Sequence, residues 1–354
     1  MSDYVDLLRQ LIQTPSFSRE EAATADILAA FITSRGVNVE RRGNNIIARH
    51  VVSDTAPWIL LNSHHDTVRP GQGWTRDPFG AMVEDGVLYG LGSNDAGGPL
   101  MTMLASFMHL RRYATLSHNV MFAATAEEEV SGNDGMAMLA RDGVLDGVAL
   151  ALVGEPTQMQ LAVAERGLLV LDCTAHGRTG HAARNEGVNA IYAAMPDIDW
   201  FRSYRFPQVS DVLGPISMTV TQINAGSQHN VVPDSCTYVV DVRVTDAYTN
   251  EEVLDVIRQH VASAVVPRSM RLRPSAIPFD HPLVQIAADM GMERYGSPTM
   301  SDQSLLPRHI PSAKIGPGNS ARSHTPDEYI TIDEVERGIE TMVALLERYL
   351  GVQP

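Results

Sequence analysis

Apolar positions recur along most of the chain with the spacing of amphipathic helices. Leu7, Leu8 and Leu11 share one helical face, which predicts a helix over 4–13. A second helix is predicted over 19–34, and Gly36 is a suitable residue to end it. Similar apolar spacing predicts further helices at 100–112, 189–204, 251–265, 281–296 and 334–350.

Short apolar runs between the first helices predict strands. The run WILL at 58–61 has no polar position, as expected of a strand that is buried on both faces of a parallel sheet. Further strands in this half of the chain are predicted at 37–43, 45–51, 118–126 and 148–156. Because strands alternate with helices, this part of the chain is predicted to be an α/β sandwich.

The pattern changes after residue 161. Strands are predicted at 167–177, 217–224, 235–245 and 270–275, and the two helices among them are those at 189–204 and 251–265. Neighbouring strands without a helix between them are typical of antiparallel pairs and of an α+β unit. We therefore predict one α/β domain made of 1–161 and 276–354, with a second domain, 162–275, inserted in it.

Composition narrows the class of protein. The chain has 354 residues, of which 44% are apolar, and its formal charge is −15. Both values suit a globular protein, and the negative charge argues against a nucleic-acid or anionic-membrane partner. Only Cys173 and Cys236 are present, too few for a disulfide framework, and both are predicted to be buried. The sequence offers no signal peptide and no apolar run of about 18 residues, so a cytoplasmic protein is expected.

Polar residues with metal-binding chemistry follow the predicted strands. His64 and Asp66 come directly after the apolar run at 58–61 and are two positions apart, so on an extended chain they point the same way. Glu127, Glu128 and Glu129 follow the strand at 118–126. Taken alone, the first pair is equally compatible with a surface hydrogen bond, and the acidic run with a solvated charge cluster. A bound cation would offset the repulsion among three adjacent carboxylates.

Three more residues complete this group. Asp95 lies in the glycine-rich run YGLGSNDAGG, which lacks the ending of a phosphate-binding loop. Glu155 ends another apolar strand, and His324 lies in a loop near the C-terminus. Taken alone, Glu155 and His324 each read as an ordinary polar residue. Together, carboxylates and two histidines form a ligand set for two divalent metal ions, an arrangement known from amide hydrolysis.

The motifs resemble those of a known family. SHHDTV, YGLGSNDAGG, EEEVSG, VGEPT, GRTGHAA, NVVPDS and SHTPDEY occur in the order found in the M20-type metallopeptidases and aminoacylases with paired metal ions. Acetylornithine deacetylase and succinyl-diaminopimelate desuccinylase belong to that family. The resemblance implies a zinc-exopeptidase-like α/β catalytic domain and an inserted, ferredoxin-like α+β domain that serves as a lid and in dimerisation.

The resemblance also implies roles for the candidate residues. It assigns His64 and Glu155 to one metal ion, Glu129 and His324 to the other, and Asp95 to both. Glu128 resembles the general base, Asp66 the residue that orients His64, and His181 a residue that reaches the partner's site across a homodimer. Glu127 receives no role. Zinc is the expected metal, and cobalt or manganese could replace it.

Substrate recognition is predicted from positions near the expected site. Arg243 and Asn230 match positions close to the substrate in relatives, and Arg184 and Arg322 are further candidates. Arginine binds a carboxylate through two hydrogen bonds, although a surface ion pair explains Arg243 equally well. Many relatives carry an arginine where this chain has Gln303, which suggests an altered pocket for the acyl group or the side chain.

The fragments SHHDTV, YGLGSNDAGG, EEEVSG, VGEPTQMQ and AERGLLVLD resemble the acetylornithine deacetylase branch of this family. This resemblance implies hydrolysis of an N-acyl-L-amino acid of arginine biosynthesis. N-acetylornithine is the default substrate, and N-acetylcitrulline, N-succinylornithine and N-succinylcitrulline remain open. The alternatives within the family are succinyl-diaminopimelate desuccinylase and a metallo-dipeptidase. A metal-free relative that only binds a partner should have lost a ligand, and none of the six matched metal-site residues is missing.

Overall fold

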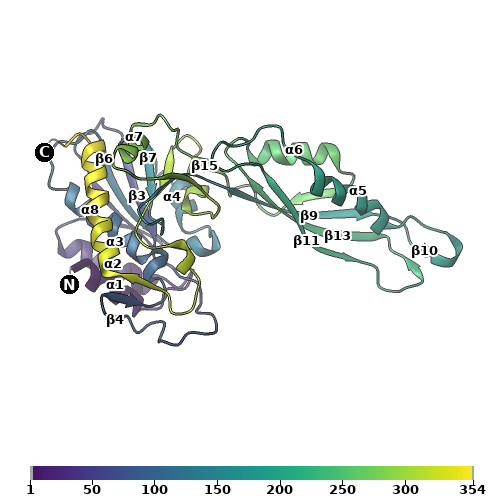
Figure 1. Cartoon of the computed structure of the whole chain (residues 1–354), viewed down its shortest axis with the longest axis horizontal. Helices are drawn as coiled ribbons and strands as arrows, with labels where there is room; N and C mark the ends of the chain where they lie inside the picture. The colour runs from purple at the N-terminus through teal and green to yellow at the C-terminus, as the bar shows by residue number, and fades with distance from the viewer. Residues whose placement is uncertain (1–2, 353–354) are drawn as a thin grey trace. The chain divides into compact units, whose positions relative to one another are not determined.

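The computed structural model describes residues 3–352, which fold into two compact units. Unit 1 comprises 1–163, 276–296 and 301–354, and unit 2 comprises 164–275 and 297–300. The first and the last described segments of the chain both belong to unit 1 (Figure 1). No helix in the described part of the chain is both long and apolar enough to cross a membrane.

Unit 1 is built on a mixed nine-stranded sheet. The strand order is β1-β2-β6-β3-β7-β17-β8-β15, and β16 also pairs with β8. Four central neighbours, β6, β3, β7 and β17, run parallel, whereas β2 and β8 join them antiparallel. The strands are β1 (Val39–Arg42), β2 (Asn45–His50), β3 (Trp58–His64), β6 (Asn119–Thr125), β7 (Val148–Val153), β8 (Leu161–Glu165), β15 (Ser275–Ala276), β16 (Arg294–Ser297) and β17 (Ser312–Lys314).

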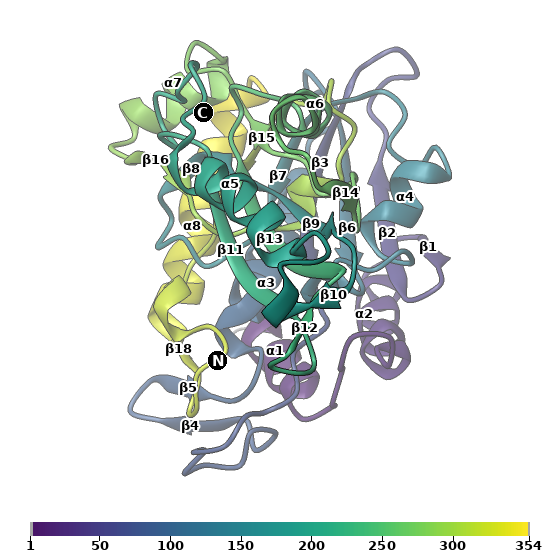
Figure 2. The ribbon, with the colours of Figure 1, turned by 90° about the vertical axis from the view of Figure 1, so that its right-hand side faces the viewer.

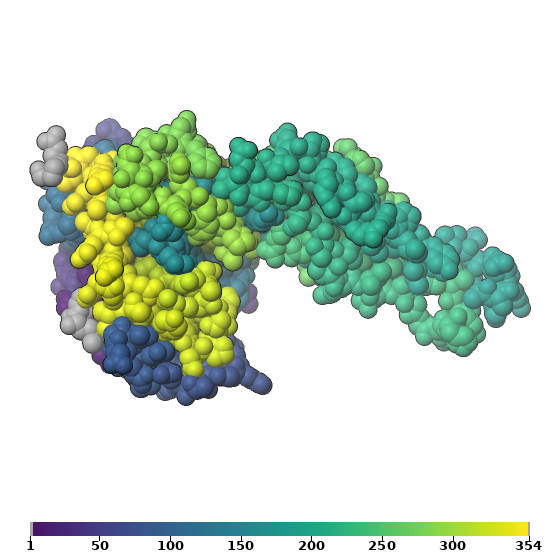
Figure 3. Space-filling view, viewed as in Figure 1, coloured from purple at the N-terminus to yellow at the C-terminus, as the bar shows by residue number. Residues whose placement is uncertain are grey.

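Helices cover both faces of this sheet, because the central strands are apolar on both. All of β6, and all of β3 after Trp58, is buried. On one side of the sheet, α3 packs against α8, which is yellow in Figure 3. Met136 and Leu139 of α4 belong to the same buried apolar cluster as Leu60 of β3. The helices are α1 (Asp3–Ile12), α2 (Ala22–Ser34), α3 (Gly98–Leu110), α4 (Met136–Arg141), α7 (Pro282–Asp289) and α8 (Ile332–Tyr349).

A small antiparallel sheet lies beside the segment that carries Asp95. It has the order β18-β5-β4, formed by Tyr329–Thr331, Val87–Tyr89 and Met82–Glu84. The turn η1 (Ser93–Gly97) follows β5 and leads into α3, and its Asp95–Ala96 peptide bond is cis. The C-terminal strand of this sheet therefore runs next to the hairpin that precedes Asp95.

Unit 2 is an α+β sandwich with one covered face. Its four-stranded antiparallel sheet has the order β11-β13-β9-β14, and α5 and α6 pack on one side (Figure 2). Burial alternates along β9 and β13, so every second residue enters the core. The elements are β9 (Gly167–His176), β10 (Gly180–His181), α5 (Ala190–Ser203), β11 (Ser217–Ala225), β12 (Val231–Val232), β13 (Ser235–Val244), α6 (Asn250–His260) and β14 (Ala264–Pro267).

The chain order β-α-β-β-α-β and the strand order of unit 2 are those of a ferredoxin-like fold. The prediction of an α/β part with helices around its sheet is confirmed. The sheet was predicted to be mostly parallel but is mixed, because only its four central strands run parallel and antiparallel strands join them on both sides. Cys173 and Cys236 are free and buried in the core of unit 2, as predicted.

Several predicted element boundaries are wrong. The helix predicted over 251–265 ends at His260, because Val261 is extended and 264–267 pairs with β9 as strand β14. Of the strand predicted over 270–275, only Ser275 is in a strand. The helix predicted over 281–296 ends at Asp289, since Gly291 has a φ of 81° that stops it. The helix predicted from 19 begins at Ala22.

Candidate active site

Three neighbouring parallel strands deliver the first group of polar side chains. His64 ends β3, Glu128 and Glu129 form the turn η2 (Glu128–Val130) just after β6, and Glu155 follows β7 by two residues. β3 lies between β6 and β7 and is parallel to both. Their carboxyl ends therefore meet at one edge of the sheet, the usual position of a site in an α/β fold.

Two loops bring Asp95 and His324 to the same edge. Oδ1 of Asp95 is 3.3 Å from Nε2 of His64, and its Oδ2 is 3.6 Å from Nε2 of His324. Nε2 of His324 is also 2.9 Å from Oε2 of Glu129. Asp95 thus lies between the two histidines and turns one oxygen toward each, which is the placement required of a carboxylate that bridges two metal ions.

The donor atoms fit a metal site. One ligand atom each from His64, Asp95 and Glu129 lies within 4.8 Å of the other two. Oε1 of Glu155 is buried, has no hydrogen-bond partner, and lies 3.9 Å from Nε2 of His64. A buried carboxylate oxygen without a partner is costly unless a cation binds it. Imidazole and carboxylate together suit zinc, and also cobalt or manganese.

The electrostatics of these side chains also favour a bound cation. Burial and the charge of Asp95 raise the pKa of Glu155 to about 8. Burial raises the pKa of Glu128 well above its ordinary value, and His64 only partly opposes this rise. His324 is hydrogen-bonded to Glu129, and this bond raises the pKa of His324 to about 9. Several carboxylates thus share a buried space in which a divalent cation would offset their repulsion.

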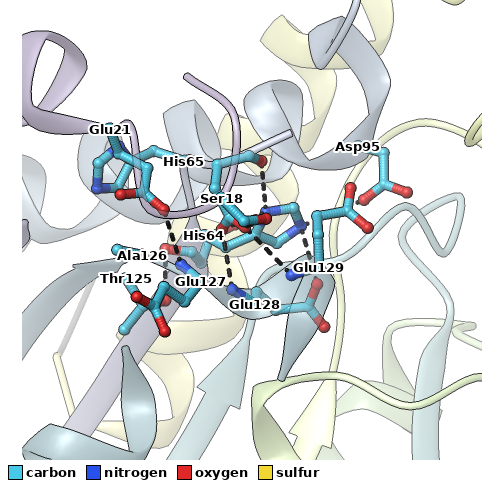
Figure 4. A network of polar contacts seen from close by, with 12 residues as sticks. Ser18, Glu21, His64, His65, Asp95, Thr125, Ala126, Glu127, Glu128 and Glu129 are labelled. Carbon is cyan, nitrogen blue, oxygen red and sulfur yellow. Dashed lines mark hydrogen bonds and ion pairs between the residues drawn. The ribbon is translucent and has the colours of Figure 1, made fainter. Parts of the chain in front are cut away.

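Asp66 is completely buried and contacts both the end of β3 and the turn that follows β6. Figure 4 shows that Ser18, His64, Glu128 and Glu129 lie close together here. Oδ1 of Asp66 accepts a hydrogen bond from the N–H of Glu128 at 3.0 Å, and its Oδ2 accepts one from the N–H of Glu129 at 3.2 Å. Oδ2 also accepts from the Ser18 hydroxyl at 2.7 Å. Nδ1 of His64 lies 3.0 Å from the carbonyl oxygen of Asp66 and 3.5 Å from its Oδ1. Asp66 therefore holds both His64 and the turn that carries Glu128.

Two further buried carboxylates, not singled out from the sequence, hold the backbone of the site. Glu21 accepts hydrogen bonds from the N–H of Glu127 and the side chain of Asn44. Glu328 accepts from three backbone N–H groups around Asp95. Glu328 lies in the SHTPDEY motif, which marked this loop as part of the site. The sequence alone does not tell which of Asp327 and Glu328 contacts the Asp95 loop.

The remaining candidates in unit 1 make contacts within the fold. Arg322 donates two hydrogen bonds to the Glu334 carboxylate, at 3.0 and 2.9 Å, and its guanidinium lies 4.3 Å from the centre of the Tyr329 ring. Gln303 is buried and donates to the Ser312 hydroxyl at 2.9 Å. These contacts use only part of each side chain, since both Arg322 bonds come from Nη1 and Oε1 of Gln303 is buried without a hydrogen-bond partner.

The candidates in unit 2 fall into two places. β10 pairs with β12, and the N–H of Ala182 donates to the carbonyl of Asn230, so His181, Arg184 and Asn230 share one end of the unit. All three are exposed. Arg243 lies near the far end of β13 and binds Asp241 through two hydrogen bonds of 2.8 and 3.0 Å. The structure thus separates Arg243 from the other three residues of unit 2.

Comparison with known proteins agrees with this arrangement. A model of the peptidase family M20/M25/M40 matches residues 60–348. Acetylornithine deacetylase from Proteus mirabilis is 27% identical, over 98% of this chain and 96% of that protein. Succinyl-diaminopimelate desuccinylase from Acidiphilium cryptum is 26% identical, over 98% of each. The solved structure of YXEP from Bacillus subtilis, described as a dinuclear metal-binding peptidase, superposes with a TM-score of 0.74 at 17% identity, over 99% of this chain and 98% of that one.

Proposed function

The chain belongs to the peptidase family M20/M25/M40 and is a hydrolase of amide bonds, and we propose that it removes the acyl group from an N-acyl-L-amino acid with the help of two divalent metal ions. Zinc is the metal we expect first, with cobalt or manganese as substitutes. N-acetyl-L-ornithine is the proposed substrate, and the proposed pathway is arginine biosynthesis.

The observation that carries this proposal is the position of Asp95 between the two histidines. One oxygen of Asp95 faces His64 and the other faces His324, at 3.3 and 3.6 Å. Glu155 beside His64 and Glu129 beside His324 would complete one site each. With the ligand set intact, a metal-free protein that only binds a partner is disfavoured.

The residues of the chain divide the chemistry between them. Two bound ions would polarise the scissile carbonyl and lower the pKa of a water molecule. Glu128 accepts the proton of that water and later donates it to the leaving amine. Asp66 keeps His64 oriented and holds the backbone of Glu128 in place. His181 of a second copy is proposed to donate a hydrogen bond to the oxygen that becomes negatively charged.

Desuccinylation of N-succinyl-diaminopimelate is the second candidate. A succinyl group carries its own carboxylate, and burying that charge requires a cationic or strongly hydrogen-bonding partner. Gln303 is neutral and already donates to Ser312, so a succinyl carboxylate would depend on another candidate, Arg184, Arg243 or Arg322. This observation favours an acetyl group, while the similar identity to both curated enzymes keeps the second candidate open.

A substrate panel tests the proposal. The zinc- or cobalt-loaded protein is assayed for amine release on N-acetylornithine, N-acetylcitrulline, N-succinylornithine and N-succinylcitrulline. N-succinyl-diaminopimelate and a dipeptide complete the panel, and each reaction has a chelator control. We expect chelator-sensitive hydrolysis with the highest kcat/KM on N-acetylornithine. Turnover of N-succinyl-diaminopimelate or the dipeptide alone would overturn the substrate assignment, and activity that survives metal removal would overturn the metal chemistry.

We further propose that the protein acts as a homodimer through unit 2. Tyr192 and Met195 on α5 are 70% and 57% exposed, and Ile223 on the edge strand β11 is 55% exposed. Large apolar side chains on a helix and a neighbouring sheet edge are suited to pairing with the same surface of a second copy. Such a pairing would allow His181 to act in the site of the partner.

A further inference from the structure

The loop that carries Asp95 is held by one buried side chain from far along the sequence. Glu328 is only 2% exposed. Its Oε1 accepts hydrogen bonds from the N–H groups of Asn94 and Asp95, at 2.8 and 2.9 Å. Its Oε2 accepts one from the N–H of Gly92 at 3.0 Å. A single carboxylate thus satisfies three backbone donors in a stretch of four residues.

Glu328 belongs to the same loop as His324, four residues later. Its own carbonyl oxygen accepts from the N–H of Gly90 at 2.9 Å, so side chain and backbone both bind the Asp95 loop. Asn94 adds a second link, because its Oδ1 accepts from the N–H of Asn319 at 2.9 Å. The loop with His324 and the loop with Asp95 are therefore fastened to each other close to both side chains.

We propose that Glu328 is a positioning residue, which fixes Asp95 relative to His324 and thereby sets the affinity for the metal ion that these two side chains share. The inference rests on the proposed two-metal site. A shared ion requires its ligands at a fixed separation, and the residues that orient ligands commonly control metal affinity. Glu328 contacts the backbone of Asp95, so it acts through that ligand and is not itself a catalytic residue.

The neighbouring Asp327 provides a matched control. Its Oδ1 accepts hydrogen bonds from the N–H groups of Thr75 and Arg76, each at 2.9 Å, and its Oδ2 accepts from the Thr75 hydroxyl. Asp327 and Glu328 thus hold backbone in the same way from adjacent positions. Only Glu328 holds a segment that contains a candidate metal ligand.

The experiment compares Glu328→Gln and Asp327→Asn with the wild-type chain. Each substitution replaces one acceptor oxygen by an amide donor at nearly constant size. In Glu328→Gln the new amide N–H₂ must face at least one backbone N–H that donated a hydrogen bond to the carboxylate, so that two donors face each other. The metal-free proteins are titrated with Zn²⁺ by calorimetry, and the Co²⁺-loaded proteins are compared by visible absorption. Thermal unfolding of the metal-free forms reports any general loss of stability.

We expect wild-type protein to bind two ions and Glu328→Gln to bind one of them about 10- to 100-fold more weakly. The cobalt spectrum of Glu328→Gln should change, and saturating metal should restore its kcat. Asp327→Asn should bind both ions as the wild type does.

Unchanged binding of both ions in Glu328→Gln would overturn the positioning role while leaving the proposed function intact. An equal loss in Asp327→Asn would also overturn it, because the effect would then be general loosening of the loop. If wild-type protein does not bind two ions, the two-metal function itself fails, and this inference fails with it.

Discussion

The carboxylates of this site fall into two groups, and the distinction is what their oxygens face. Glu155, Asp95 and Glu129 offer carboxylate oxygens toward one space, where burial raises the pKa of Glu155 and of Glu129. Asp66 and Glu328 turn their oxygens toward backbone N–H groups instead. The first group gathers negative charge that a bound cation would balance, and the second group holds the backbone that carries the first.

Glu128 allows the sharpest test at this scale. Glu128→Gln removes the group that accepts and returns the proton, so kcat should fall by about 10²- to 10⁴-fold. Metal content, measured by elemental analysis, should stay as in the wild type, because Glu128 is assigned to neither ion. Glu127→Gln changes the adjacent carboxylate, which pairs with Arg19 at 3.9 Å, and should retain turnover within a few-fold. A fully active Glu128→Gln protein would refute the proposed general base.

Residue chemistry could be predicted from the sequence where a side chain follows an apolar strand or stands in a family motif. His64, Glu128 and Glu155 were found in this way. Glu21 and Glu328 were not, because a carboxylate that accepts from a distant backbone leaves no regular spacing in the sequence. The pairing of Arg322 with Glu334 was missed for the same reason.

At the scale of elements, the turn that follows β6 depends on close backbone contact. A Cβ added at Gly135 would lie 1.9 Å from the carbonyl oxygen of Ala126, at the end of β6. Ala126 lies two residues before Glu128, so a shift of its backbone would disturb the turn that carries Glu128 and Glu129. The turn is therefore sensitive to a single methyl group.

Gly135→Ala should lower the free energy of unfolding by about 1–3 kcal/mol and weaken metal binding. Chemical denaturation and zinc titration measure the two effects. Gly71→Ala is the control, since a Cβ there meets no atom within 4 Å, and it should behave as wild type. Equal stability and equal metal affinity in both variants would contradict the packing described for this turn.

The start of α7 should depend on pH. Nδ1 of His281 accepts a hydrogen bond from the N–H of Leu283 at 3.2 Å, which requires Nδ1 to be unprotonated. Burial lowers the pKa of His281, and Asp280 only partly opposes this. Because the folded-state pKa lies below the unfolded value of about 6.5, stability is complete above that pH and is lost as pH falls toward the folded-state pKa.

His281→Asn keeps a side-chain acceptor at the start of the helix but removes the titrating group. Thermal melts between pH 7.5 and 5.5 should therefore show a smaller loss of stability in the variant, by at most about 1 kcal/mol. Identical pH dependence in the two proteins would contradict the role of His281 as a neutral helix cap.

Element types could be predicted from periodicity, but their ends could not. The helix over 251–265 was extended too far because apolar spacing continues through Val261 and Val265. The structure places Val265 in a strand, because it pairs with Cys173 of β9. Tertiary pairing decides such positions, and a local pattern does not contain it.

At the scale of the whole molecule, the sequence placed the candidate ligands in 1–161 and 276–354, and all of them lie in unit 1. His181, Arg184, Arg243 and Asn230 lie in unit 2. The separation of Arg243 from the others along β13 could not be seen in advance, since it follows from strand pairing. The exposed apolar side chains of unit 2 likewise appear only once the sheet is formed.

If the protein is a homodimer through unit 2, charged substitutions on the exposed apolar surface should separate the two chains. Light scattering should give twice the chain mass for the wild type and a smaller mass for Tyr192→Asp/Met195→Asp, because each charge would sit in the apolar contact. A mixture of His181→Ala and Glu128→Gln chains should recover part of the activity if His181 acts across the dimer. A monomeric and fully active wild type would contradict this arrangement.

The central claim is that two metal ions in unit 1 drive amide hydrolysis. The most direct measurement titrates metal-free protein with Zn²⁺ and follows both bound metal and release of ornithine from N-acetylornithine. The account predicts no turnover without metal, activity that rises as ions bind, and saturation at no more than two ions per chain. Hydrolysis by the metal-free protein, or two bound ions without hydrolysis of any N-acyl amino acid, would contradict it.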